Sequence, residues 1–180
     1  MLSAPLNLEK VDAGHLFDYL YSFFHRDFVV NTTLLNGQIH IDPCSNSMDE
    51  GKENSFWHLT TREYERQVKE GNKYVTKTER FLDYGRAARI EWVRKIITNH
   101  TNSSICCFYH QESNKKRDIR LYLWAHADDF VVILQKLGRS SALLVTSFYI
   151  DRRGKRDDYT KRHQRYISGQ ARELKGCEWF

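Results

Sequence analysis

Residues 119–150, IRLYLWAHADDFVVILQKLGRSSALLVTSFYI, decide the fold class of this chain. They contain three apolar segments, Ile119–His126, Phe130–Leu137 and Ala142–Ile150, which are rich in the β-branched and aromatic residues that strands favour. Short polar connections (Ala-Asp-Asp and Leu-Gly-Arg-Ser) separate these segments. Connections this short favour hairpins over βαβ crossovers. The stretch therefore predicts a three-strand antiparallel meander.

The N-terminal part shows helical periodicity followed by a hairpin signal. Asp12 is expected to cap a first helix over Ala13–Arg26, where apolar residues recur every three or four positions. A short strand is expected near Phe28–Val30. Asn36 and Gly37 then stand between apolar segments, which indicates a tight β-hairpin turn.

The middle of the chain is expected to contain a loop, a buried segment and a long helix. Pro43–Asn54 is polar and reads as a loop, and Phe56–Thr60 as a short buried segment. A charged stretch runs from there to Thr78. Apolar periodicity then predicts a helix over about Arg80–Asn99, and Ile105–His110 reads as a strand.

The C-terminal segment, 151–180, is strongly basic, with nine Lys or Arg residues against five Asp or Glu residues. It predicts a basic helix from about Arg156, which frays near Gly169 or ends at Gly176. The expected fold is α+β: N-terminal helices packed on a twisted antiparallel sheet that ends in a three-strand meander, followed by a basic C-terminal helix.

The length of 180 residues fits a single domain, 1–180, with one sizeable core. Within it, 1–55 is the less assignable part, 56–166 the core region and 151–180 the basic segment. The formal charge of +5 and the pI of about 9.0 favour a polyanionic partner.

No signal peptide or long apolar run is recognised in the sequence, so a cytoplasmic protein without a membrane segment is expected. The cysteines form no C-x-x-C pair and the histidines are scattered, so we expect reduced thiols, no metal site and no cofactor.

Arg86 and Arg89 are anomalous because they fall on the apolar face of the helix expected over Arg80–Asn99. A guanidinium stays charged in a protein, and its burial without a partner is costly. Either a carboxylate of the sheet pairs with each arginine, or the helix lines a pocket that receives a phosphate. Two arginines on one face of a basic protein favour the phosphate.

His58 and Thr146 are further candidates for a site. Histidine is the natural acid or base at neutral pH, although a histidine beside aromatic residues also serves as a hydrogen-bonded structural residue. Strict alternation would place Thr146 on one face with Leu144 and Phe148, where its hydroxyl needs a partner.

The strand at Ile119–His126 offers a second candidate surface. Alternation places one set of side chains on the face opposite the core: Arg120, Tyr122, Trp124 and His126. This set is typical of a surface that stacks bases and binds phosphate, and equally of an ordinary amphipathic outer face.

Three blocks of the sequence resemble a known group of nucleases: FWHLTTRE (56–63), RFLDYGRAARIEWVRKIITN (80–99) and DFVVILQKLGRSSALLVTSFYID (129–151), followed by the basic helix. The pattern resembles bacterial and phage toxins of the barnase–EndoU–colicin–RelE-like ribonuclease fold group, over roughly Phe56–Tyr166. The resemblance implies a toxin that cleaves RNA through its 2′-hydroxyl without metal, and an acidic antitoxin or immunity partner.

The resemblance also implies roles for individual residues. His58 would act as general acid or base, and Arg86 and Arg89 would bind the phosphate and the transition state. Thr146 and Tyr149 would position the phosphate or the 2′-hydroxyl. Thr146 and Tyr149 point to opposite faces of a regular strand, so only one belongs to the site unless a bulge intervenes. The residues expected to bind substrate are Arg62, Arg86, Arg120, Lys155, Arg156 and Arg162.

Two other functions remain open at this point. The first is a non-catalytic nucleic-acid-binding module that uses the Arg120–His126 surface and the basic tail. The second is a phage or mobile-element accessory protein that interacts with other proteins and whose arginines form only structural salt bridges.

Overall fold

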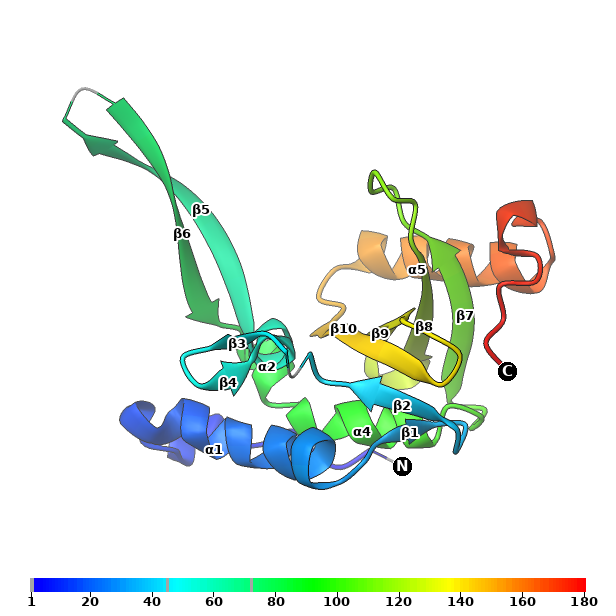
Figure 1. Ribbon diagram of the computed structural model, residues 1–180, viewed down its shortest axis with the longest axis horizontal. Coiled ribbons are helices and arrows are strands. Elements are labelled where there is room, and N and C mark those ends of the chain that lie inside the picture. Colours follow the sequence, from blue (N-terminus) through cyan, green and yellow to red (C-terminus); the bar gives the residue numbers. More distant parts are fainter. Residues whose placement is uncertain (1, 45, 72) are drawn as a thin grey trace.

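A six-stranded sheet forms the centre of the computed structural model, which describes residues 2–44, 46–71 and 73–180 (Figure 1). Its strands, in spatial order, are β1 (Leu34–Leu35), β2 (Ile39–Asp42), β10 (Ser141–Tyr149), β9 (Phe130–Lys136), β8 (Ile119–Ala125) and β7 (Ile105–Gln111). The predicted meander and the α+β class are confirmed. The sheet is mixed rather than antiparallel, because β2 pairs in parallel with β10.

Helices cover both faces of this sheet. One face packs on α1 (Leu16–Phe24), α2 (Asn54–Thr60) and α4 (Ile90–Thr98), and the other on α5 (Arg153–Ile167). All five residues from Leu121 to Ala125 are consequently buried. Tyr159 of α5 packs its ring against Trp124 and Phe148 of the sheet.

The predicted first helix begins later than expected: Asp12 caps a 3₁₀ turn, and the α-helix α1 starts at Leu16 with His15 at its N-cap position. The Asp12 carboxylate accepts a hydrogen bond from the Gly14 amide (2.9 Å), and a 3₁₀ turn, Ala13–His15, leads into α1. The strand predicted near Phe28–Val30 is wrong: His25–Val30 continues α1 as a π-helical turn. The Thr33 hydroxyl donates to the Asp27 carbonyl (2.6 Å), so side chains that follow the turn hold it in place.

The hairpin predicted at Asn36 and Gly37 is confirmed as β1–β2. Both residues have positive φ angles, 52° and 67°, as a type I′ turn requires. This hairpin aligns β2 beside β10.

The predicted loop Pro43–Asn54 contains a small hairpin, β3 (Met48–Asp49) and β4 (Lys52–Glu53); Ser45 lies outside the described residues. The segment Phe56–Thr60 is buried as predicted except at His58, and it belongs to the helix α2. Short 3₁₀ turns complete the chain at Leu8–Lys10, His126–Asp128 and Arg172–Leu174.

The charged stretch after α2 forms a two-stranded arm, β5 (Thr61–Glu70) and β6 (Lys73–Leu82), whose ten antiparallel pairs stand away from the sheet (Figure 1). No strand was predicted here, and Asn72 lies outside the described residues. Most of its side chains are polar on both faces, so apolar alternation gives little signal.

The long helix predicted over Arg80–Asn99 is wrong. Its first three residues belong to β6, where pairing with β5 holds them extended. The Asp83 carboxylate then accepts from the Arg86 amide (3.2 Å) and caps a short helix, α3 (Tyr84–Ala87). A separate helix, α4, begins at Ile90 with Arg89 at its N-cap position.

The basic C-terminal helix is confirmed as α5, which begins at Arg153 and ends before Gly169, whose φ of 69° is left-handed. Among the described residues, no helix is both long and apolar enough to span a bilayer. All four cysteines have free thiols.

Candidate functional site

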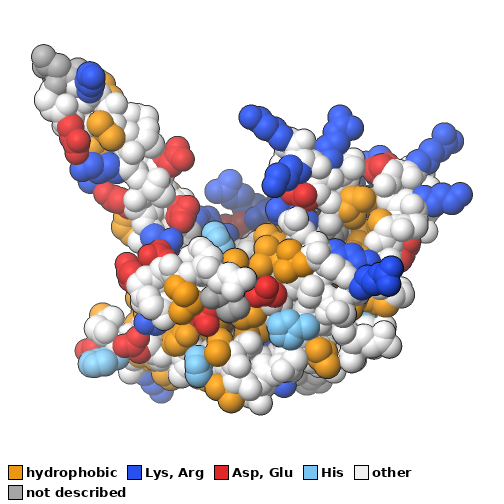
Figure 2. All heavy atoms as spheres, viewed as in Figure 1, with side chains coloured by type: hydrophobic (Ala, Val, Ile, Leu, Met, Phe, Trp, Pro, Cys, Tyr) orange, Lys and Arg blue, Asp and Glu red, His pale blue; other side chains and the backbone are white. Residues whose placement is uncertain are grey.

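One notch is surrounded by five segments: the base of the arm, the end of α2, the start of α3, the end of β10 and the start of α5. The space-filling view shows the arm standing apart from the body with a hollow between them, and Lys and Arg side chains in its floor (Figure 2). Five of the predicted site residues meet here: His58, Arg62, Arg86, Thr146 and Lys155.

The backbone carbonyl of His58 joins two of these residues. It accepts a hydrogen bond from Arg86 Nη1 (3.0 Å) and another from the Thr146 hydroxyl (3.1 Å). Arg86 Nη1 also donates to the Thr61 carbonyl (3.2 Å). These bonds satisfy carbonyls at the end of α2 and fix His58 relative to α3 and β10.

Asp83 neutralises part of the positive charge at this point. Its Oδ2 accepts from Arg62 Nε (3.1 Å) and Nη2 (2.8 Å). Arg86 Nε lies 3.2 Å from the same oxygen, as an ion pair without the alignment of a hydrogen bond. Burial lowers the pKa of Arg86, the Asp83 charge counteracts this, and the Arg62 charge lowers it further. Arg86 thus has a carboxylate partner, supplied by the cap of α3 and not by the sheet.

Lys155 adds a further cation beside this pair. Its ammonium lies 4.0 Å from the centroid of the Phe148 ring. Partial burial lowers the pKa of Lys155; the Asp151 charge opposes this, and the charges of three arginines lower it further: Arg86, Arg62 and Arg152. The cations of this group, Arg62, Arg86, Arg152 and Lys155, therefore outnumber its two carboxylates, Asp83 and Asp151. The surplus of positive charge favours a bound anion.

The His58 ring belongs to an exposed residue and makes no hydrogen bond to any residue that the structure describes. Partial burial lowers the pKa of His58 below its ordinary value of 6.5. The Glu63 charge opposes this change, while the Arg80 and Arg86 charges lower the pKa further. The imidazole is therefore mainly neutral at pH 7 and has a free lone pair with which to accept a proton.

The protonation of His58 can be measured directly by an NMR titration of the histidine ring. We expect a midpoint below 6.5, and a lower one still in Glu63→Gln, because the substitution removes the negative charge that favours the imidazolium. A midpoint above 6.5, or a rise in Glu63→Gln, would contradict this electrostatic account.

Arg89 and Tyr149 form a separate pair. The Arg89 guanidinium lies 4.4 Å from the centroid of the Tyr149 ring and 5.1 Å from that of Trp92, and its Nη1 donates to the Gly85 carbonyl (2.8 Å). Arg89 makes no ion pair with a carboxylate in the described part of the chain, and its buried Nε has no hydrogen-bond partner. Aromatic ring faces, rather than a carboxylate, surround this charge.

A bulge in β10 decides which face its residues occupy. The register with β9 shifts between Leu144 and Thr146, so Thr146 does not share the face of Leu144, as regular alternation predicted, and lies with Phe148 on the α5 side. From Thr146 to Tyr149 the pairing is regular. Thr146 and Tyr149 therefore point to opposite faces, as expected for an odd separation, and only Thr146 contacts His58.

Three predicted substrate-binding residues lie elsewhere and have partners of their own. Arg120 lies 3.3 Å from Gln135 Oε1 and 3.8 Å from a Glu112 oxygen, and Arg162 pairs with Asp158 (2.7 Å). Arg156 pairs with Asp129 and donates to the His126 carbonyl (3.1 Å). None of these interactions joins them to His58.

The stacking surface proposed for β8 is overturned. Tyr122 and Trp124 are 2% and 1% exposed because α5 covers this face of the sheet. They cannot stack on bases unless α5 moves away. The stacking role expected of Tyr122 and Trp124 is therefore contradicted.

Asp83 orients both Arg62 and Arg86 but was not among the predicted site residues. The order Asp-Tyr-Gly-Arg is compatible with a helix cap at Asp83, but the apolar periodicity on either side of it hid this signal. Asp151 was missed too, since nothing in the sequence relates it to Lys155.

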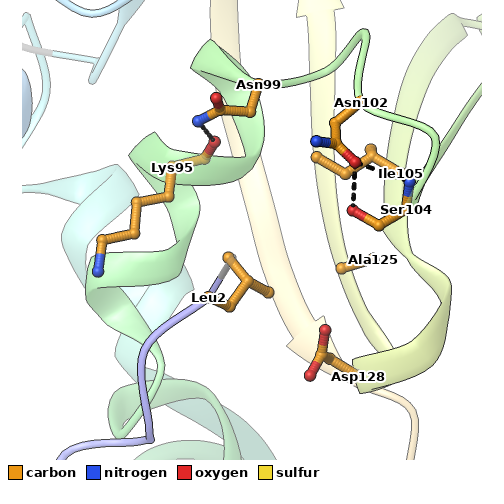
Figure 3. A pocket seen from close by; sticks show the side chains of 8 residues that line it. All are labelled: Leu2, Lys95, Asn99, Asn102, Ser104, Ile105, Ala125 and Asp128. Carbon is orange, nitrogen blue, oxygen red and sulfur yellow. Dashed lines mark hydrogen bonds between the residues drawn. The ribbon is translucent and has the colours of Figure 1, made fainter.

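A second cavity lies between the end of α4 and the strands β7 and β8 (Figure 3). Its polar groups are largely satisfied internally: Lys95 donates to the Ser3 hydroxyl (3.0 Å), and the Asn99 amide to the Lys95 carbonyl (2.7 Å). None of the predicted site residues lines it, so it is not the candidate site.

The chain matches no family model, and comparison with curated proteins and with solved structures returns no match either. Within the described ranges, no three His, Cys, Asp or Glu side chains are placed to hold a metal ion together.

Proposed function

We propose that this chain is an endoribonuclease that cleaves RNA through the 2′-hydroxyl without using a metal ion. One observation carries the proposal: His58, Arg62, Arg86 and Lys155 come from four separate segments and meet around one notch. An imidazole without a hydrogen-bond partner among the described residues, beside an excess of cations, is suited to the acid–base and electrostatic catalysis of phosphodiester cleavage.

Each side chain has a role in this reaction. Neutral His58 takes the proton of the 2′-hydroxyl, whose oxygen attacks the adjacent phosphorus. Arg62 and Arg86 stabilise the negative charge that grows on the phosphate oxygens, while their shared contact with Asp83 keeps both guanidiniums in place. The bond from phosphorus to the 5′-oxygen then breaks, and the protonated Lys155 donates a proton to that oxygen. The products are a 2′,3′-cyclic phosphate and a 5′-hydroxyl.

The surplus of positive charge also supports the proposed partner. A carboxylate-rich antitoxin or immunity protein would be attracted to the notch and would block the approach of RNA. As a toxin, the chain should arrest growth when it is expressed alone.

The decisive experiment incubates the purified protein with total RNA in the presence of EDTA. We expect discrete fragments that end in 2′,3′-cyclic phosphate, and no cleavage of an oligonucleotide with a 2′-deoxyribose at the cleavage position. His58→Ala protein, purified in parallel, controls for contaminating ribonuclease.

Intact RNA under all conditions would refute the proposal. So would equal cleavage of the 2′-deoxy substrate, because attack by the 2′-hydroxyl is then impossible. Loss of activity on addition of EDTA would refute the metal-independent mechanism.

A further inference from the structure

The base of the arm has a hollow lined by three aromatic side chains beside the notch. Its lining residues are Arg62, Tyr64, Phe81, Leu82, Asp83 and Tyr84. The aromatic residues are 52% (Tyr64), 51% (Phe81) and 62% (Tyr84) exposed. Three exposed aromatic rings in one hollow form an unusually apolar patch on an otherwise charged arm.

The register of the arm explains why these rings face the notch. Arg62 pairs with Phe81 across the two strands, and Tyr64 stands two residues further along the same face. The Tyr64 and Phe81 rings meet edge to face, with centroids 5.7 Å apart. The opposite face is occupied at its base, where Arg80 lies over Trp57 (5.0 Å) and pairs with Asp49 (2.6 Å).

Arg62 belongs both to this hollow and to the notch. Its guanidinium bonds Asp83 and acts on the pKa of Lys155. A ligand that places an anionic group near Arg62 and Lys155 would therefore bring its neighbouring atoms to the rings of Tyr64 and Phe81.

We propose that the aromatic hollow binds an unpaired nucleobase of single-stranded RNA next to the phosphate held in the notch. The inference rests on the proposed function and specifies its substrate. Bases stack on exposed aromatic rings irrespective of sequence, while arginines beside them hold the phosphates. A base-paired duplex does not fit this arrangement, since the faces of its bases are already stacked on their neighbours.

The test measures RNA binding with the His58→Ala protein, so that no substrate is cut. Labelled single-stranded oligoribonucleotides, intact or with single abasic positions, are titrated in a fluorescence anisotropy assay. We expect Phe81→Ala and Tyr64→Ala, each added to His58→Ala, to weaken binding by roughly 5- to 150-fold, the range of one lost base stack. Phe81→Trp should retain the affinity, and one abasic position should reproduce the loss.

Tyr74→Ala is the matched control. Tyr74 lies on the same arm, is 72% exposed and belongs to the opposite face, so its removal should leave the affinity unchanged. Circular dichroism of each variant checks that the arm remains folded.

Unchanged affinity in Phe81→Ala, an equal loss in Tyr74→Ala, or equal binding of duplex RNA would overturn the inference. Binding of an acidic protein that depends on Phe81 while RNA binding does not would overturn it as well. The two proposals fail separately. If the wild-type protein cleaves RNA and Phe81→Ala has no effect, only the proposed base site is refuted. If RNA binding depends on Phe81 but no RNA is cleaved, only the proposed ribonuclease activity is refuted.

Discussion

Replacing His58 by alanine should slow RNA cleavage by about two to four orders of magnitude, the contribution typical of a general acid or base. The reason is that His58 lies next to Arg86, and its imidazole is mainly neutral at pH 7 and makes no hydrogen bond among the described residues. Single-turnover cleavage of a fluorogenic RNA measures the rate, and thermal unfolding checks the fold. The fold should be retained, because the contacts of Arg86 and Thr146 are made with the backbone carbonyl of His58 and not with its ring.

His40→Ala is the control for this experiment. His40 is exposed on β2, where its backbone pairs with Leu34 of β1 and its amide donates to the Ser140 carbonyl (2.8 Å). Its substitution should leave cleavage unchanged. A His58→Ala enzyme that retains more than about a tenth of the wild-type rate would remove His58 from the mechanism, since general acid–base catalysis contributes more than that.

Trp124→Ala should have the largest effect on stability, a loss of about 3–5 kcal/mol in the free energy of unfolding. Trp124 is 1% exposed and lies between the sheet and α5, where its ring contacts Tyr159. Its indole Nε1 has no hydrogen-bond partner among the described residues, so the predicted loss comes from the removed apolar contacts and the cavity left behind. Urea unfolding followed by circular dichroism gives the change.

Tyr74→Ala supplies the reference for Trp124→Ala, because it removes a ring that is largely exposed to water. It should change the free energy of unfolding by less than about 1 kcal/mol. If Trp124→Ala instead left stability unchanged and abolished RNA binding, Trp124 would be an exposed RNA contact and the packing of α5 described above would be wrong.

The predicted elements that are correct depend mainly on interactions over short distances along the chain. Asp12 caps the 3₁₀ turn before α1 through an amide two residues away, and Asn36 and Gly37 adopt a turn that only a few residue types tolerate. The meander of β8, β9 and β10 follows from apolar strand formers joined by short connections. Local physical chemistry is sufficient in each case, so the sequence alone predicts them.

The candidate site, in contrast, depends on contacts between segments that are distant along the chain. His58, Arg86 and Lys155 were singled out by residue type, but their convergence depends on the β5–β6 arm, which apolar alternation does not reveal. The apolar periodicity over 80–99 predicted one helix, but it contains no information about pairing with a distant strand. In the structure, Phe81 and Leu82 pair across the arm with Arg62 and Thr61. Pairing with a distant strand outweighed the local helical pattern there.

The sequence by itself determined the α+β class, the meander, the basic C-terminal helix and the presence of unusual arginines. The tertiary structure alone decided what those arginines meet: Asp83 for Arg86, and the rings of Tyr149 and Trp92 for Arg89. It also decided that α5 buries Trp124, and that the bulge in β10 places Thr146 beside His58. The physical reason is that periodicity and capping report interactions within one segment, whereas the partner of a charge and the cover of a sheet face are contributed by segments that only folding brings together.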